Sequence, residues 1–296
     1  MAACSRAQII DFMAPNRLFI RDIKGAQEKA RIPSDSAISS RKKAADVSVK
    51  YPENKNLNIT GIMVPVGYRV FDKRIKNRLF ERNILYDCLP DQVDRYGDPF
   101  GMIYLASQIS DDTNTDDTSI GEAFATKESQ QAASSLQADL LAMGLAFTAD
   151  VLPPGPDVAE LLDSERKARS AKVGLWLDGS PFLWRLDADG LPLAQDGSVA
   201  RTGAPGRFRI VEGRVASSAL IGEKLLINMG DNYRTDVTLE VPSRLVRKMR
   251  KEGLIDHIIA GQFIQFRGRF DYFNGPRFVL ADSRTLVIGP RSVDAP

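Results

Sequence analysis

Short runs of alternating apolar and polar residues recur along most of this chain and predict a mainly β protein with a few helices. In residues 7–21 the alternation passes through a turn at residues 13–16, which is typical of a β-hairpin. Further strands are predicted in three short apolar runs, at residues 57–62, 84–86 and 101–105.

Helical spacing of apolar residues occurs in three segments of the first part of the chain. Residues 68–81 carry apolar side chains on one face and mostly basic side chains on the other. A second helix is expected at residues 136–143, ahead of Gly144. A third is expected to begin after Asp157, which can cap it, and to end at Gly174.

A second β unit is predicted from about residue 206 onward. One helix is expected within it at residues 243–251, closed by Gly253. Its strands are predicted at residues 208–215, 224–229, 235–241, 262–270 and 277–288. Glycine, proline and aspartate accumulate in residues 179–205, which indicates a linker or small subdomain. We therefore expect one domain at residues 1–178 and another at residues 206–296.

Two long segments of the first domain lack this patterning. Residues 24–56 and 108–134 are rich in polar and charged side chains, so both are interpreted as mobile insertions. The second is acidic around residues 111–117, but it lacks the glycine and the terminal glutamate of a calcium-binding EF-hand loop. A linker is favoured over a calcium site there.

Composition narrows the chemistry that is available. The 40 basic and 38 acidic residues leave a net charge of +2, so a nucleic-acid role would need a local basic patch. Two cysteines and one histidine exclude a disulfide scaffold and a zinc cluster, and they leave carboxylates and arginines as the candidate catalytic groups. No apolar run reaches the ~18 residues of a membrane span, and no signal peptide is expected at the N-terminus.

Two separated segments of the first domain resemble the thermonuclease (staphylococcal-nuclease-like) family. They are residues 94–98, Asp-Arg-Tyr-Gly-Asp, and residues 164–176, which contain Ser-Glu-Arg-Lys-Ala-Arg and Gly-Leu-Trp. The resemblance implies an α+β fold, in which a five-stranded oligonucleotide/oligosaccharide-binding (OB) barrel carries helices. It also implies nuclease chemistry, in which aspartates bind calcium, two arginines neutralise the transition state and a glutamate activates water.

The second domain resembles a small OB-like β-barrel that follows the nuclease domain in some proteobacterial relatives. The segments that carry this resemblance are residues 206–208, 211–213, 226–238, 266–269 and 274–276. The compartment stays open, because a bacterial envelope protein and a mitochondrial protein both fit such a pair of domains.

The chain departs from the thermonuclease pattern at the five positions that the resemblance assigns to catalysis. Met13 and Met63 stand where calcium-binding aspartates are expected, and Val66 stands where the glutamate is expected. Asn58 and Asp98 replace the two arginines. Thioether and isopropyl groups do not bind a hard cation, which prefers oxygen. We therefore expect no catalytic residues, no metal and no cofactor.

Three functions remain in order of preference. The first is a non-catalytic structural or interaction protein, such as an accessory subunit of a larger assembly, with a protein partner. The second is a nucleic-acid-binding module that uses the basic helix and the C-terminal domain. The third is a residual calcium-dependent nuclease that hydrolyses phosphodiesters. The candidate anion-binding surface of the second function consists of Arg69, Lys73, Arg74, Lys76, Arg78, Arg267 and Arg269.

Overall fold

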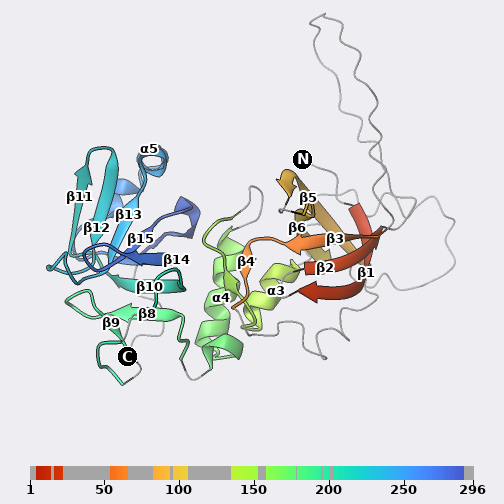
Figure 1. Cartoon of the computed structure of the whole chain (residues 1–296), viewed down its shortest axis with the longest axis horizontal. Helices are drawn as coiled ribbons and strands as arrows, with labels where there is room; N and C mark the ends of the chain where they lie inside the picture. The colour runs from red at the N-terminus through yellow and green to blue at the C-terminus, as the bar shows by residue number, and fades with distance from the viewer. Residues whose placement is uncertain are drawn as a thin grey trace, which may run out of the picture. The chain divides into compact units, whose positions relative to one another are not determined.

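The structure is a computed structural model of the whole chain, which forms two compact units (Figure 1). Unit 1 comprises Met1–Thr60 and Val64–Asp139, and unit 2 comprises Gly61–Met63 and Leu140–Pro296. Both are mainly β, as the alternation predicts. The residues that the structure describes are 5–14, 17–22, 54–65, 83–93, 96–105, 135–152, 158–177, 179–194, 196–200 and 203–289.

Unit 1 contains the closed five-stranded barrel that the family resemblance implies. The barrel has the strand order β1-β2-β3-β6-β5, and β1 pairs with β5 to close it. The pair β3 and β6 is parallel, and the other neighbouring pairs are antiparallel. The five strands are β1 (Ser5–Ala14), β2 (Arg17–Asp22), β3 (Asn54–Ile59), β5 (Asn83–Val93) and β6 (Pro99–Leu105).

A buried glutamine attaches the start of helix α3 (Leu136–Ala142) to strand β6. The Gln137 side chain donates from Nε2 to the carbonyl of Gly101 at 3.0 Å and accepts from the amide of Ile103 at 3.2 Å. Both groups of the amide are therefore satisfied away from water, as a buried polar side chain requires. The predicted helix at residues 68–81 and nearly all of both predicted insertions lie outside the described residues.

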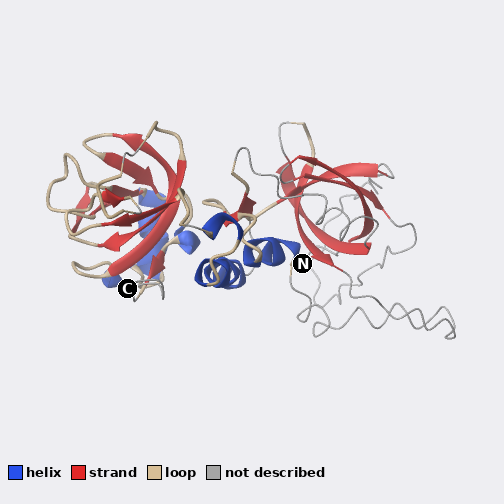
Figure 2. Ribbon diagram, turned by 90° about the horizontal axis from the view of Figure 1, so that it is seen from below, coloured by secondary structure: helices blue, strands red, loops and turns tan. Residues whose placement is uncertain are grey.

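Unit 2 is built on a curled sheet of nine strands (Figure 2). Its order is β11-β12-β13-β15-β14-β10-β8-β9, and β16 pairs with β14. The strands are β8 (Leu183–Leu186), β9 (Pro192–Leu193), β10 (Phe208–Arg214), β11 (Ser217–Ile221), β12 (Lys224–Asn228), β13 (Thr238–Val241), β14 (Phe263–Tyr272), β15 (Pro276–Val279) and β16 (Val287–Ile288).

The sheet of unit 2 repeats the strand order of the barrel in unit 1. Strands β10 and β11 follow each other directly, so they act as two halves of one bent first strand. The order then becomes first, second, third, fifth and fourth strand, with the third and fifth parallel, as β3 and β6 are in unit 1. Both units thus have the Greek-key order of an OB-like fold.

Helix α5 (Ser243–Lys251) connects the third and fourth strands of this second barrel, at the residues that the sequence predicts. It buries Val246 and Met249 and exposes a strongly basic face. The segment 179–205, interpreted as a linker or small subdomain, forms β8 and β9. Strand β8 pairs with β10 in parallel, so this segment extends the sheet of unit 2.

The thermonuclease-like helix α4 (Val158–Ser170) packs on the sheet of unit 2. Its Ala168 belongs to an apolar cluster with Trp176 of the short helix η1 (Gly174–Trp176) and with Phe147 of strand β7 (Phe147–Thr148). Phe208 and Ile210 of β10 complete this cluster. Strand β4 (Ile62–Met63) pairs with β7 beside it. Within the described part of the chain, no helix has the length and apolar character needed to cross a membrane.

We expect Gly174→Ala to destabilise unit 2 more than Gly222→Ala does. Both glycines have positive φ angles, 58° and 62°, so alanine is strained by about 1–2 kcal/mol at either position. A Cβ on Gly174 would also overlap the carbonyl of Gly144, whereas nothing lies within 4 Å of a Cβ on Gly222. Both tryptophans, Trp176 and Trp184, lie in unit 2. Urea unfolding followed by tryptophan fluorescence measures the difference, and equal losses would contradict the proposed overlap.

Candidate functional site

Strand pairing brings three polar residues of unit 1 together, at the place where the family resemblance implies catalytic arginines. Arg17 is the first residue of β2, Asn58 lies near the end of β3, and Asp98 directly precedes β6. Arg17 is the cross-strand partner of Asn58, and Asn58 is the partner of Phe100 on β6. Sheet register therefore juxtaposes residues that are about forty positions apart in sequence.

These three residues form a connected set, which we call the Arg17 network. The Nε of Arg17 donates to Oδ1 of Asn58 at 3.1 Å, and Nδ2 of Asn58 donates to the backbone carbonyl of Asp98 at 3.3 Å. An ion pair of 3.4 Å joins Nη1 of Arg17 to Oδ2 of Asp98. The guanidinium also lies 5.7 Å from the centre of the exposed Tyr96 ring. Asn58 is buried, and Arg17 and Asp98 are partly buried.

The charges of the Arg17 network cancel. It contains one cation, one anion and a neutral amide, whereas arginines at positions 58 and 98 would add two further cations. A phosphate approaching Arg17 must displace Asp98 and is repelled by its carboxylate. Near a protein surface, opposite charges about 4 Å apart attract by about 4 kcal/mol, so this competition is strong. Within this set of three described side chains, the one positive charge is therefore matched by one negative charge.

The turn before β6 keeps the backbone that the resemblance implies. Gly97 has a φ of +85°, a conformation that side chains with a Cβ disfavour, and no atom lies within 4 Å of where a Cβ would stand. Glycine is therefore favoured here by the positive φ angle, and not because a Cβ would clash with a neighbouring atom. It lets the chain turn so that Asp98 faces Arg17. The two residues that begin this motif, Asp94 and Arg95, lie outside the described residues.

The two methionines at expected calcium-ligand positions differ in how far the structure describes them. Met63 belongs to unit 2, where it pairs with Phe147 across β4 and β7 and lies partly buried against the apolar cluster of Trp176. Its thioether is therefore in an apolar setting. Met13 lies within β1, but its side chain is not described, and Val66 lies outside the described residues. Where side chains are described, no group of three or more His, Cys, Asp or Glu could hold a metal ion.

The structure removes Arg267 from the candidate anion-binding surface. Its side chain is fully buried in unit 2, where Nη1 pairs with Oε2 of Glu165 at 2.9 Å and donates to the carbonyl of Thr148 at 3.1 Å. Alternation along β14 does place Arg267 on the face opposite Phe266. Helix α4, which carries Glu165, covers that face. Alternation along one strand does not show whether another element packs on either of its faces.

The remaining residues of that surface divide into two groups. Arg269 is exposed, and its Nη1 donates to the carbonyl of Gly206 at 2.9 Å. The basic helix contributes the other residues, which all lie outside the described part of the chain, namely Arg69, Lys73, Arg74, Lys76 and Arg78.

A second buried ion pair holds α4 to the sheet. Nη1 of Arg169 lies 2.7 Å from Oε1 of Glu212 on β10, and the guanidinium lies 5.2 Å from the centre of the Trp176 ring. Oε2 of Glu165 accepts the amide of Thr148 at 2.6 Å in addition to Arg267. The motif residues of α4 thus contact the C-terminal sheet. Sequence analysis assigned no individual role to Arg17, Arg169 or Glu212, because each acquires its role from a partner far away in the chain.

Residues 47–178 match the family of staphylococcal nuclease homologues, and this part of the chain is a staphylococcal-nuclease-like domain. No curated protein matches the chain. Two similar solved structures are a chain of the S. pombe Stn1–Ten1 complex and the extended Tudor domain of Drosophila melanogaster Tudor-SN (p100). The first is 11% identical with a TM-score of 0.26, covering 38% of this chain and 81% of its own. The second is 9% identical with a TM-score of 0.32, covering 60% and 100%. Neither likeness carries a functional argument.

We expect Arg267→Met to lower the free energy of unfolding of unit 2 by about 3–5 kcal/mol, because it leaves Glu165 charged and buried without its partner. The double variant Glu165→Gln/Arg267→Met is expected to recover part of this loss. Breaking the exposed pair between Arg247 and Glu223 by Arg247→Ala is expected to cost about 1 kcal/mol or less. Urea unfolding followed by tryptophan fluorescence measures all three. A double variant less stable than Arg267→Met would contradict the buried charge as the cause.

Proposed function

We propose that the staphylococcal-nuclease-like domain of this chain works without catalysis, as the scaffold of a structural or interaction protein and an accessory subunit of a larger assembly. The Arg17 network is the observation that supports this most directly. Two groups that should neutralise a phosphate are a neutral amide and a carboxylate, and the nearby cation is engaged by that carboxylate. Such a site has lost the charge on which phosphodiester hydrolysis by this fold depends.

The contacts of the motif residues also support a scaffold role. Glu165 and Arg169 are engaged in buried ion pairs with strands of the C-terminal sheet. Trp176 lies in the apolar cluster that β10 completes. These contacts give the motif residues a role in packing that requires no chemistry. A fold whose recognisable residues serve packing is well suited to hold a second barrel in place and to present surfaces to a partner.

We expect the purified chain to show no calcium-dependent cleavage of denatured DNA. Loss of one charge-stabilising donor lowers turnover by about 10²–10³-fold in other enzymes, so two losses place the rate at least about 10⁴-fold below that of an active relative. The assay compares the chain with an active thermonuclease and with the chain's own Arg17→Ala variant, prepared identically. Calcium-dependent cleavage that Arg17→Ala abolishes would overturn the proposal, whereas equal trace cleavage by both preparations identifies a contaminant.

The accessory-subunit part of the proposal has a separate test. The chain isolated gently from its own cells is expected to elute together with a protein partner, in a species heavier than the 32.7 kDa of the chain alone. Light scattering during size-exclusion chromatography measures that mass. Recombinant chain run alone provides the matched reference. Elution of the native material at the mass of the lone chain would contradict an accessory role.

A further inference from the structure

Two sequence segments that carry the resemblance of the C-terminal domain meet in unit 2. One is the loop between β12 and β13, and the other is the turn between β14 and β15. Gly275 in the turn has a φ of 93°, and a Cβ there would overlap the carbonyl of Asp236 and lie 3.0 Å from the carbonyl carbon of Thr235. The backbones of the two connections are therefore in contact, and only glycine permits this approach.

A buried carboxylate anchors the first of these loops. Asp236 is fully buried, and its Oδ2 accepts the amide of Gly230 at 3.0 Å. Burial, and secondarily the negative charge of Asp231, raises the pKa of Asp236 above its ordinary value. The bond to Gly230 ties the two ends of the loop together. Residues 231–235 are consequently displayed at the surface by a fixed support.

Three aromatic side chains on these connections face solvent. Tyr233 is 53% exposed, Tyr272 is 49% exposed and Phe273 is 64% exposed. In contrast, Trp184, Phe266, Phe270 and Phe278 of the same sheet are buried in the core. Tyr233 and Phe273 each lie two residues from the point where the two connections touch, and large exposed aromatic groups on a folded surface commonly mark a binding site. We call Tyr233, Tyr272 and Phe273 the aromatic platform.

Arginines accompany the rings of the platform. The guanidinium of Arg234 lies 5.7 Å from the centre of the Tyr233 ring, and that of Arg277 lies 5.1 Å from the centre of the Phe273 ring. Arg277 is neutralised by a bidentate bond to Asp271. Among the described residues, Arg234 and Arg269 have no carboxylate partner and donate instead to the Tyr233 hydroxyl and the Gly206 carbonyl. Their positive charges are available to an anion.

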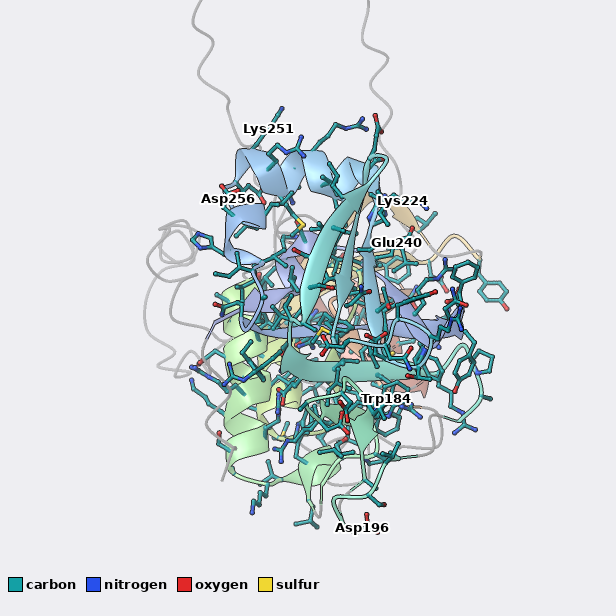
Figure 3. The ribbon with its side chains drawn as sticks, turned by 90° about the vertical axis from the view of Figure 1, so that its left-hand side faces the viewer. Trp184, Asp196, Lys224, Glu240, Lys251 and Asp256 are labelled. Carbon is teal, nitrogen blue, oxygen red and sulfur yellow. The ribbon has the colours of Figure 1, made fainter. Side chains whose placement is uncertain are left out.

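An acidic residue on the neighbouring strand β13 is also paired with basic side chains. Glu240 on β13 pairs with Lys224 of the neighbouring strand β12 at 2.7 Å, and Figure 3 shows these two side chains side by side. Arg277 lies within 3.5 Å of its other oxygen. Glu240 is therefore already compensated from two sides. Asp231 remains as the exposed carboxylate of the loop.

We propose that the aromatic platform binds single-stranded nucleic acid, with bases stacked on its rings and phosphates held by Arg234 and Arg269. Exposed aromatic rings beside uncompensated cations are the means by which proteins hold single strands without reading their sequence. The turn between the fourth and fifth strands is also one of the loops that OB folds use for oligonucleotides. A duplex does not fit this chemistry, because its bases are already stacked on each other.

Fluorescence anisotropy with a labelled oligo-dT of about 15 nucleotides tests the proposal on the full chain. We expect binding at about 50 mM salt that weakens as salt rises. Tyr233→Ala and Phe273→Ala are each expected to weaken binding about five- to hundredfold, the range measured for lost base stacking. Tyr233→Phe keeps the ring and is expected to bind like the unaltered chain. These positions are exposed, so unchanged urea midpoints serve as the check on folding.

A charge-matched pair separates the platform from general attraction to basic residues. Arg234→Ala is expected to weaken binding and to lower the salt slope by about 0.7, the value for one phosphate contact on a single strand. Arg244→Ala removes an exposed arginine that, like Arg234, has no carboxylate partner among the described residues. It lies on the strongly basic helix α5, which has no aromatic residue, so its loss is expected to change neither quantity.

Three results would overturn the proposal. They are no binding of the oligonucleotide at low salt, undiminished binding by both alanine variants of the rings, and equal losses in Arg234→Ala and Arg244→Ala. The first result would favour a protein as the partner of the platform. The third would mean that the basic residues of α5 attract the oligonucleotide as strongly as Arg234 does. Each result is independent of the nuclease assay, which concerns the Arg17 network in unit 1.

Discussion

The buried ion pair between Glu165 and Arg267 is the contact on which the architecture of unit 2 depends. It joins the helix of the nuclease-like domain to the fourth strand of the C-terminal barrel. A buried pair adds little net stability over two well-packed apolar residues, because both charges lose their hydration. It does restrict the ways in which the helix can dock, since any other arrangement would leave one charge buried without a partner. The neighbouring pair of Arg169 and Glu212 applies the same restriction at a second point.

The residues that match the thermonuclease pattern and the residues that depart from it lie in different settings in the structure. Glu165 and Trp176, which carry the family pattern, have their contacts within the packed interior of unit 2. Asn58 and Asp98, which depart from it, belong to the Arg17 network of unit 1. Packing and catalysis place separate demands on the same domain. The demands of packing can therefore be met by residues other than those that catalysis would require.

Local pattern predicted the elements that depend on local interactions. The helix at residues 243–251 and the five strands of the first barrel follow from apolar spacing and turn residues, and the structure forms them. The roles of Arg17 and Arg267 could not be predicted in this way. Each depends on a residue that is distant in sequence, and register or helix packing brings the two together. Strand β11 was missed because its five residues are all exposed and show no buried face.

Several arginines in both units are paired with carboxylates, and the chain as a whole is nearly neutral. Arg17, Arg169 and Arg267 each pair with a carboxylate of the chain itself. A net charge of +2 provides no long-range attraction for a polyanion, and any such partner must find a local excess of positive charge. Arg234 and Arg269, which have no carboxylate partner among the described residues, are the cations on which the proposed binding of single strands relies. The surface proposed for binding therefore lies in unit 2, on residues different from those of the Arg17 network in unit 1.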